Sequence, residues 1–308
     1  MTPRPANGLE RVVVLVNCRA GSIRQRHSDI EEALRSAFAH HKIAADFELI
    51  DGDGLRARVE RARERAKRHE IDAIVIGGGD GSVHVAACVL TGTGIPLGIV
   101  PLGTLNHFAK DLGLPLRMED AVATIAFGRV RTVDLAEVNG EIFINNSSIG
   151  IYPYMVIDRE RRRTGRKLAK WTAMVPAFFR MLRHFPRRRL RISAEGFERP
   201  YRTPCLFVGN NEYSMELFTL GRRRRLDSGK LWFYVVKPRE PLAFFWMVCR
   251  LCFGRMDQSH DLDTFELSAA VVTAKASRLP VALDGDVEVM HMPLHYRARP
   301  GALSVIVP

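Results

Sequence analysis

The chain has 308 residues, 46% of them hydrophobic, which is enough for one large or two ordinary domains with real cores. It has no apolar run of about 18 residues, which argues against a transmembrane helix, and its five scattered cysteines favour reduced thiols over a disulfide framework or a zinc site. The net charge of +12, mainly from arginine, predicts anionic partners, and the absence of a signal-peptide layout predicts a cytoplasmic protein.

Strands and helices alternate through the first part of the chain. We predict strands at residues 11–16, 43–50, 71–76, 95–100 and 130–138, separated by helices at 28–41, 55–70, 83–90, 108–112 and 118–127. Continuous apolar strands between amphipathic helices are typical of a buried parallel sheet that helices cover on both faces. We therefore predict a doubly wound α/β domain over residues 8–133.

Two of these strands end in glycine turns, at residues 77–82 (GGGDGS) and 101–106 (PLGTLN). Glycines let backbone N–H groups turn towards an anion, and a following helix N-terminus favours negative charge. Since neighbouring parallel strands end at one edge of a sheet, both turns are expected to face one ligand crevice. Neither turn has the Walker lysine or the dinucleotide-binding spacing. Asp80 inside the first turn suits a metal-neutralised phosphate or a proton transfer, or it only caps the next helix.

The pattern changes after about residue 133. Asn139-Gly140 is a hairpin signal, and short predicted strands follow at 142–146, 190–194, 203–208, 231–236, 265–272 and as a pair around 281–289. This pattern indicates an antiparallel β domain over residues 134–297, interrupted by a helical stretch at 168–185. Leu283-Asp284-Gly285-Asp286 lies between the last pair of strands, where Asp-Gly favours a tight hairpin.

Two apolar segments and three arginine-rich blocks lie in this second part. Residues 171–185 and 241–254 are apolar and aromatic, and the basic blocks are residues 159–170, 187–191 and 222–225. Apolar side chains beside arginine clusters suit contact with an anionic membrane or an acyl-chain slot, whereas the alternative is core helices and solvated faces. No known nucleic-acid-binding module is visible, so we expect no nucleic-acid partner.

The two glycine turns together resemble the diacylglycerol kinase catalytic domain family. GGGDGS and PLGTLNHFA, about twenty residues apart, match that family's GGGDGT and PxGTxNxFA signatures at the family's distance. The family includes bacterial diacylglycerol kinases and related lipid, sphingosine and ceramide kinases. The resemblance extends over nearly the whole chain. It implies a nucleotide domain followed by a β-sandwich lipid domain, with residues 298–308 returning to the first.

The resemblance also assigns roles to residues of this sequence. The residues that would hold ATP, with Mg²⁺ as its companion ion, are Asn17, Gly21, Gly78, Gly79, Asp80, Gly81, Ser82, Gly103, Thr104 and Asn106, with Asp80 also a catalytic candidate. Asp284 matches the first residue of the family's Asp-Gly-Glu, which carries the proposed proton acceptor, so we favour Asp284 as the base or the group that orients the base. Asp286 replaces the family's glutamate and is the alternative base. Asp227 lies in a segment that holds a structural Mg²⁺ in some members, but Ser228 replaces the aspartate before the glycine.

The sequence therefore predicts an ATP-dependent kinase that phosphorylates a lipid hydroxyl, with diacylglycerol giving phosphatidic acid as the default. We expect a cytoplasmic protein in peripheral contact with an anionic membrane. The sequence allows a homodimer but does not require one. The first alternative is a kinase of a soluble hydroxyl compound, because NAD kinases and phosphofructokinases share a GGDG turn. The second is a degenerate member that binds lipid or nucleotide without turnover, which the change at Ser228 motivates.

Overall fold

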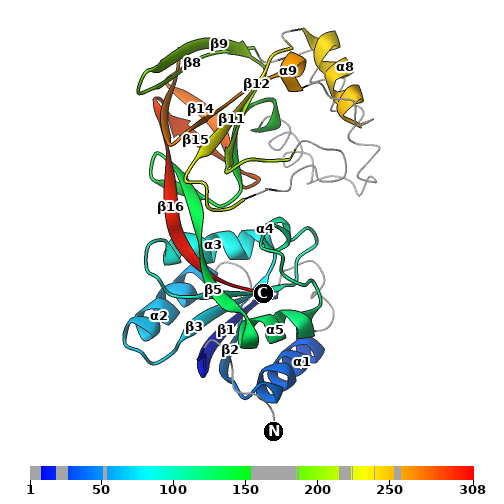
Figure 1. The fold of residues 1–308 in the computed structure, drawn as a ribbon, viewed down its shortest axis with the longest axis vertical. Coiled ribbons are helices and arrows are strands. Elements are labelled where there is room, and N and C mark those ends of the chain that lie inside the picture. The colour runs from blue at the N-terminus through cyan, green and yellow to red at the C-terminus, as the bar shows by residue number, and fades with distance from the viewer. Residues whose placement is uncertain are drawn as a thin grey trace. The chain divides into compact units, whose positions relative to one another are not determined.

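A computed structural model gives the fold, and the chain divides into two compact units (Figure 1). Unit 1 comprises Met1–Leu135, Arg222–Ser228 and Arg299–Pro308, and unit 2 comprises Ala136–Gly221 and Gly229–Ala298. The residues that the structure describes are 8–18, 27–50, 54–153, 185, 187–214, 223, 225–238, 240–252 and 258–308. Three features of the sequence analysis lie outside these ranges. They are Gly21, the basic block at 159–170 and the predicted helix at 168–185 except for its last residue.

Unit 1 is built on a parallel sheet. Its strands lie in the order β2 (Ala44–Ile50), β1 (Arg11–Asn17), β3 (Ala73–Gly78) and β4 (Leu97–Pro101), with the end of β16 (Leu294–Val307) parallel to β4. The strand order reverses at β1, because β2 pairs with one of its edges and β3 with the other. In open α/β sheets this reversal is the point where ligands bind.

Helices cover both faces of this sheet, as Figure 1 shows. The helices of unit 1 are α1 (His27–His40), α2 (Leu55–Lys67), α3 (Asp80–Leu90), α4 (His107–Asp111) and α5 (Met118–Phe127). Alternate residues of β1, Val12, Val14 and Val16, pack with Leu34 and Phe38 of α1 and with the apolar face of α5. Helices α2 and α3 pack together on the opposite face. The predicted doubly wound α/β fold is confirmed.

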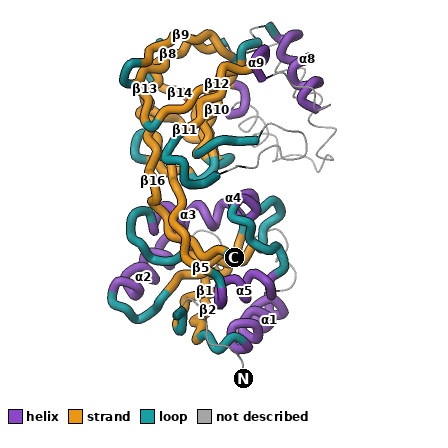
Figure 2. Tube along the Cα trace, viewed as in Figure 1, coloured by secondary structure: helices purple, strands orange, loops and turns teal. Residues whose placement is uncertain are grey.

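Unit 2 consists mainly of antiparallel strands, which Figure 2 shows in orange. One sheet has the order β12 (Leu262–Leu267), β11 (Leu231–Val236), β10 (Cys205–Asn210), β7 (Asn146–Gly150), β14 (Arg278–Leu283) and β15 (Asp286–His291). The other contains the first half of β16, β13 (Ala269–Ala274), β8 (Arg188–Ala194) and β9 (Phe197–Thr203), while β5 (Arg129–Val138) pairs with both β16 and β6 (Glu141–Phe143).

The two sheets of unit 2 enclose one apolar core. Val208, Phe233 and Val281 from the first sheet pack with Ile192 and Tyr296 from the second, and all five are almost completely buried. The Phe233 and Tyr296 rings meet edge to face, with their centroids 6.0 Å apart. This sheet-on-sheet packing is the β-sandwich that the resemblance implies, so the predicted fold class holds for both units.

Several predicted boundaries are wrong. The predicted strand at 203–208 includes the end of β9 and most of β10, because Pro204 has no N–H for pairing and marks the junction. The predicted strand at 265–272 is likewise two strands, β12 and β13, which belong to different sheets. Strand β9 was not predicted, because its polar sequence FERPYRT is that of an exposed edge strand. The segment expected to return to the first domain, residues 298–308, contains the end of the 14-residue strand β16, which begins already at Leu294.

Unit 2 also contains helices among the residues that the structure describes. They include α8 (Pro241–Cys252) and α9 (Gln258–Asp261). The inner face of α8 presents Phe244 and Met247, which pack with Tyr213, Tyr234 and Leu262 in a second apolar cluster. No helix among the residues that the structure describes has the length and apolar character needed to cross a membrane.

Candidate functional site

The two glycine turns meet at the carboxyl ends of β3 and β4, next to the end of β1. The Leu102 N–H donates to the Gly78 carbonyl over 3.0 Å, which ties the second turn to the first. The two turns approach so closely that a Cβ on Gly103 would lie 2.5 Å from the Gly79 Cα. Real Cβ atoms do not come that near to a backbone carbon. Glycine at position 103 is therefore a steric requirement of the paired turns.

Side chains fix the first turn against β1. The Asn17 Nδ2 donates to the Ser82 Oγ over 2.9 Å. A Cβ on Gly78 would lie 2.7 Å from both the Cβ and the Oγ of Ser82, so this turn also excludes larger residues. The first N–H groups of α3 have no partner within the helix, and they follow directly after Gly79. The turn thus presents helix N-terminal donors, which stabilise an anion such as phosphate.

Asn106 and Asp80 organise the second turn. The Asn106 side chain accepts from the Gly103 N–H over 3.0 Å and donates to the Gly103 carbonyl over 2.8 Å, and Asn106 itself has a left-handed backbone with φ of 50°. The Asp80 Oδ1 accepts from the Phe108 N–H over 3.1 Å. Asp80 therefore caps α4 and not its own helix α3, for which Gly79 is the N-cap residue. This bond positions a half-buried carboxylate between the two turns.

Three predicted nucleotide-binding residues of unit 1 remain. Gly81 and Thr104 are exposed at the two turns, and a Cβ on Gly81 would have no neighbour within 4 Å. Gly21 lies outside the described residues. The structure thus brings together Asn17, Gly78, Gly79, Asp80, Ser82, Gly103 and Asn106.

A buried ion pair supports α4, and sequence reasoning missed it. The Arg223 Nε donates to the Asp111 Oδ2 over 2.8 Å, and both side chains are almost fully buried, at 0% and 2% exposure. The Arg223 guanidinium also lies over the Phe108 ring, 5.5 Å from its centroid. Phe108 is the residue whose N–H binds Asp80, so Arg223 acts as a positioning residue for that contact. The run of four arginines at 222–225 was the only sequence signal, and it indicated a charged surface.

In unit 2, the predicted Asp-Gly turn is a two-residue hairpin with an unusual anchor. Asp284 and Gly285 both have positive φ, at 50° and 103°, as the tightest hairpin turns require. The Asp284 carboxylate accepts three backbone N–H bonds, from Ile144 over 2.8 Å, Asn145 over 2.7 Å and Asn146 over 3.1 Å. Both carboxylate oxygens are thus engaged in holding the connection between β6 and β7. Asp286, by contrast, is exposed.

A cluster of asparagines surrounds this anchor. Asn210 is fully buried and its Nδ2 donates to the Ile144 carbonyl over 3.0 Å, while the Asn146 Nδ2 lies 3.5 Å from the Tyr213 hydroxyl. Asn211 is equally buried, and its Nδ2 donates to the Asn210 Oδ1 over 3.2 Å. Sequence reasoning did not select these residues. The signal was present, since an Asn-Asn pair occurs at 145–146 and again at 210–211, beside apolar strands.

Asp227 does not fit a divalent cation. Its carboxylate accepts from the Arg131 Nη2 over 2.7 Å and from the Arg225 Nε over 3.1 Å. The hydrogen bond from Arg131 holds the pKa of Asp227 below its ordinary value, and Arg225 lowers it further while burial opposes both. Two guanidinium groups repel a cation, and no cluster of three carboxylate, histidine or cysteine side chains exists within the described residues. The structural Mg²⁺ of some family members therefore has no site at Asp227.

We expect Asp227→Asn to lower the free energy of unfolding by about 0.2–1 kcal/mol at neutral pH, because the ion pairs are more than one-third exposed. Since its folded pKa is depressed, the contribution of Asp227 is complete above the ordinary value of 3.8 and disappears as pH falls through the lower, folded value. Urea unfolding of both proteins should give the same difference at pH 7 and pH 5. A difference that vanished already by pH 5 would contradict the assignment.

Comparisons with known proteins find similarity in the segment that contains the two glycine turns. Residues 11–138 match the model of the family described as "Diacylglycerol kinase catalytic domain". Over 134 residues the chain is 37% identical to the "Diacylglycerol kinase" of Mycobacterium tuberculosis (strain ATCC 25618 / H37Rv), which covers 42% of this chain and 41% of that protein. Over 95 residues it is 37% identical to the "Probable lipid kinase YegS-like" of Yersinia pestis (strain Pestoides F), covering 30% and 32%. The alignments thus span about two fifths or less of these curated relatives.

The fold has a solved counterpart over the whole chain. The structure of a diacylglycerol kinase from Bacillus anthracis str. Sterne covers 98% of each chain with a TM-score of 0.68 and 22% sequence identity. At that identity the likeness establishes the two-part fold. The family match lies in the segment that carries both glycine turns. Through residues 11–138, the chain is therefore similar to the diacylglycerol kinase catalytic domain family.

Proposed function

We propose that this protein is a lipid kinase that transfers the γ-phosphate of ATP to a lipid hydroxyl, with diacylglycerol as the acceptor and phosphatidic acid as the product. The observation that carries the proposal is the pair of interlocked glycine turns at the strand-order reversal of unit 1, with Asp80 between them. The relatives named diacylglycerol kinase and lipid kinase support it. In this proposal residues 8–133 and 298–308 bind ATP, and residues 134–297 bind the lipid.

The donor side of the reaction needs charge compensation for the triphosphate. The N-terminal donors of α3 and the backbone of the paired turns would bind phosphate oxygens, and Asn17 and Ser82 would hold the first turn in place. ATP enters as its Mg²⁺ complex, and that ion supplies positive charge over the phosphates. Mg²⁺ bound to a nucleotide keeps several water ligands and needs only one or two protein carboxylates. Asp80, beside the phosphate-binding turns, could therefore contact the Mg²⁺ complex of ATP by itself.

The acceptor side needs a base for the lipid hydroxyl. We assign this role to Asp286, because it is exposed and follows the hairpin turn directly. Asp284 would be the positioning residue, because three backbone N–H groups already occupy its carboxylate. Asp284 as the base is the alternative, and substitutions at the two aspartates separate these roles.

The test is a labelled-phosphate assay on lipids. The protein is incubated with γ-labelled ATP, Mg²⁺ and a total lipid extract in mixed micelles, and the lipids are separated by thin-layer chromatography. We expect one labelled lipid, identical in mobility to phosphatidic acid, and at least about tenfold less label with Asp80→Asn. The substitution keeps the size of the side chain but removes the charge that faces the phosphate turns. Equal labelling by the two proteins would contradict the role of Asp80.

A soluble acceptor and a non-catalytic protein are distinguished in the same experiment. Label in the aqueous fraction but in no lipid would favour a kinase of a soluble hydroxyl compound. ATP binding without label in either fraction would favour a degenerate member that has no kinase activity. The arginine contacts of Asp227, where some family members bind a cation, support this alternative. Either result would overturn the proposed lipid kinase activity.

A further inference from the structure

Helix α8 carries apolar side chains on two faces, and only one of them is buried. On the inner face, Phe244 and Met247 are 8% and 6% exposed, and the Phe244 ring meets that of Phe185 edge to face at 5.4 Å. On the outer face, Leu242 is 67% exposed and Trp246 is 56% exposed. These two residues are four positions apart, so they lie one above the other on the helix surface. The core of unit 2 explains the inner face but not the outer one.

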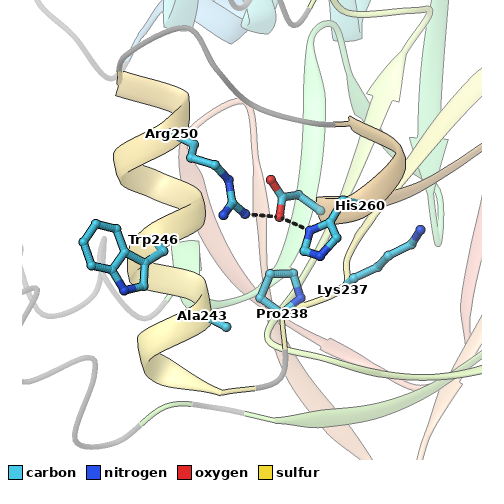
Figure 3. Close-up of a pocket in the computed structure, with 7 residues that line it drawn as sticks. Lys237, Pro238, Ala243, Trp246, Arg250 and His260 are labelled. Carbon is cyan, nitrogen blue, oxygen red and sulfur yellow. Dashed lines mark hydrogen bonds and ion pairs between the residues drawn. The ribbon is translucent and has the colours of Figure 1, made fainter.

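A pocket of about 410 Å³ lies beside this outer face (Figure 3). Helix α8 provides one wall, the segment after β11 another and α9 the third. The residues that line it include Lys237, Pro238, Ala243, Trp246, Arg250 and His260. The Trp246 indole and the Arg250 guanidinium extend from α8, and the Lys237 ammonium extends from the segment after β11, as the sticks in Figure 3 show. An exposed aromatic ring thus borders a pocket with cationic side chains.

One carboxylate, Asp261, organises the cations of this pocket. It is completely buried, and its Oδ1 accepts from the Arg250 Nη2 and lies 3.0 Å from the His260 Nδ1. The negative charge of Asp261 is therefore compensated inside the pocket, while Arg250, His260 and Lys237 reach the surface. The Arg250 Nε and the Asp261 Oδ2 are buried and have no hydrogen-bond partner within the described parts of the chain.

We propose that this pocket and the outer face of α8 form a docking site for an anionic phospholipid bilayer. Leu242 and Trp246 would enter the headgroup region, where tryptophan and leucine are favoured at membrane interfaces. Lys237 and Arg250 would lie at the level of the lipid phosphates, which attract cationic side chains. The charge of the bilayer complements this surface and the net charge of +12 of the chain. The site goes beyond phosphoryl transfer, because it binds the membrane surface whether or not a lipid is phosphorylated.

The first experiment measures vesicle binding without nucleotide. The full chain is sedimented with vesicles of phosphatidylcholine alone or of phosphatidylcholine mixed with phosphatidylglycerol. We expect binding mainly to the mixed vesicles, and a roughly tenfold lower partition coefficient for the double variant Leu242→Ser/Trp246→Ser. The matched control is Val289→Ser on β15, which removes an apolar side chain of similar exposure, 64%, elsewhere in unit 2. It should bind vesicles as the wild type does.

The second experiment locates the contact. The variant Trp171→Phe/Trp232→Phe keeps Trp246 as its single tryptophan, and lipids brominated near the headgroup should quench its fluorescence. Lys237→Gln should lower binding to mixed vesicles about fivefold, since each basic residue near an anionic surface contributes about a factor of five. Unquenched Trp246 in a sedimenting protein, or equal binding by the double variant and the wild type, would overturn the proposal. Because no ATP is present, these results are independent of the kinase assay.

Discussion

Gly103→Ala is expected to lower the affinity for ATP by about 100-fold. The added Cβ would lie 2.5 Å from the Gly79 Cα and 2.7 Å from the Asn106 Oδ1, so the two turns must separate. In enzyme sites a misplacement of about 1 Å can lower the reaction rate by about 100-fold, and we expect the separated turns to lose phosphate contacts to a similar extent. The same overpacking should lower the free energy of unfolding by about 1–3 kcal/mol. Binding is measured by titration with ATP·Mg²⁺, and stability by urea unfolding.

The control for this substitution is Gly54→Ala. Gly54 precedes α2 and is exposed, and a methyl group added there would have only the Ile50 Cγ2 nearby, at 3.9 Å. ATP affinity should be unchanged in this variant, with a stability loss of at most about 1 kcal/mol from the helix N-cap. Wild-type ATP affinity in Gly103→Ala would show that the phosphates bind elsewhere. The proposed nucleotide site would then fail, even though the similarity of residues 11–138 to the family would remain.

Asp286→Asn is expected to reduce turnover by about 10²–10⁴-fold without changing stability. A general base contributes a factor of that size, and an exposed side chain contributes little to folding. Asp284→Asn should behave differently, because one of its three N–H donors would face an amide NH₂ group. We expect it to lose about 1.5–3 kcal/mol of stability, the value of a hydrogen bond to a charged group, together with turnover.

Asparagine is the informative replacement at both positions. Asp284 has a left-handed backbone, which asparagine tolerates and alanine does not, so Asp284→Asn changes the charge without straining the hairpin. Turnover is measured with the labelled-lipid assay and stability by urea unfolding. If Asp284→Asn lost turnover at unchanged stability while Asp286→Asn stayed active, Asp284 would be the base and Asp286 would have no catalytic part.

The structure refines how the nucleotide turns work. Asp80 was predicted either to act on phosphate chemistry or to cap the helix that follows it. It caps α4, the helix after the second turn, and so it connects the two motifs that resemble the family's signatures. Arg223 and Asp111 support the same helix from inside unit 1. The family motifs are thus joined by contacts that neither motif contains by itself.

The sequence by itself determined the elements whose signals are local. The apolar runs between helices predicted the parallel sheet, and the two glycine turns predicted the family and the ligand-binding edge. The Asp-Gly pair at 284–285 predicted its hairpin. These features depend on residue spacing, because strand and helix periodicity and the steric freedom of glycine act within a few residues. The predicted strand boundaries were wrong where one apolar run continued through two strands, as at residues 265–272.

Tertiary structure alone decided the partners of the charged side chains. Asp284 binds N–H groups 138 to 140 positions away, Asp111 binds Arg223 112 positions away, and Asp227 binds Arg131 96 positions away. These contacts anchor the candidate base Asp284 to the backbone, bury Arg223 of the arginine run and pair Asp227 with arginine. The sequence does not show which group a charged side chain will contact. The path of the folded chain decides which groups meet and how far water is excluded between them.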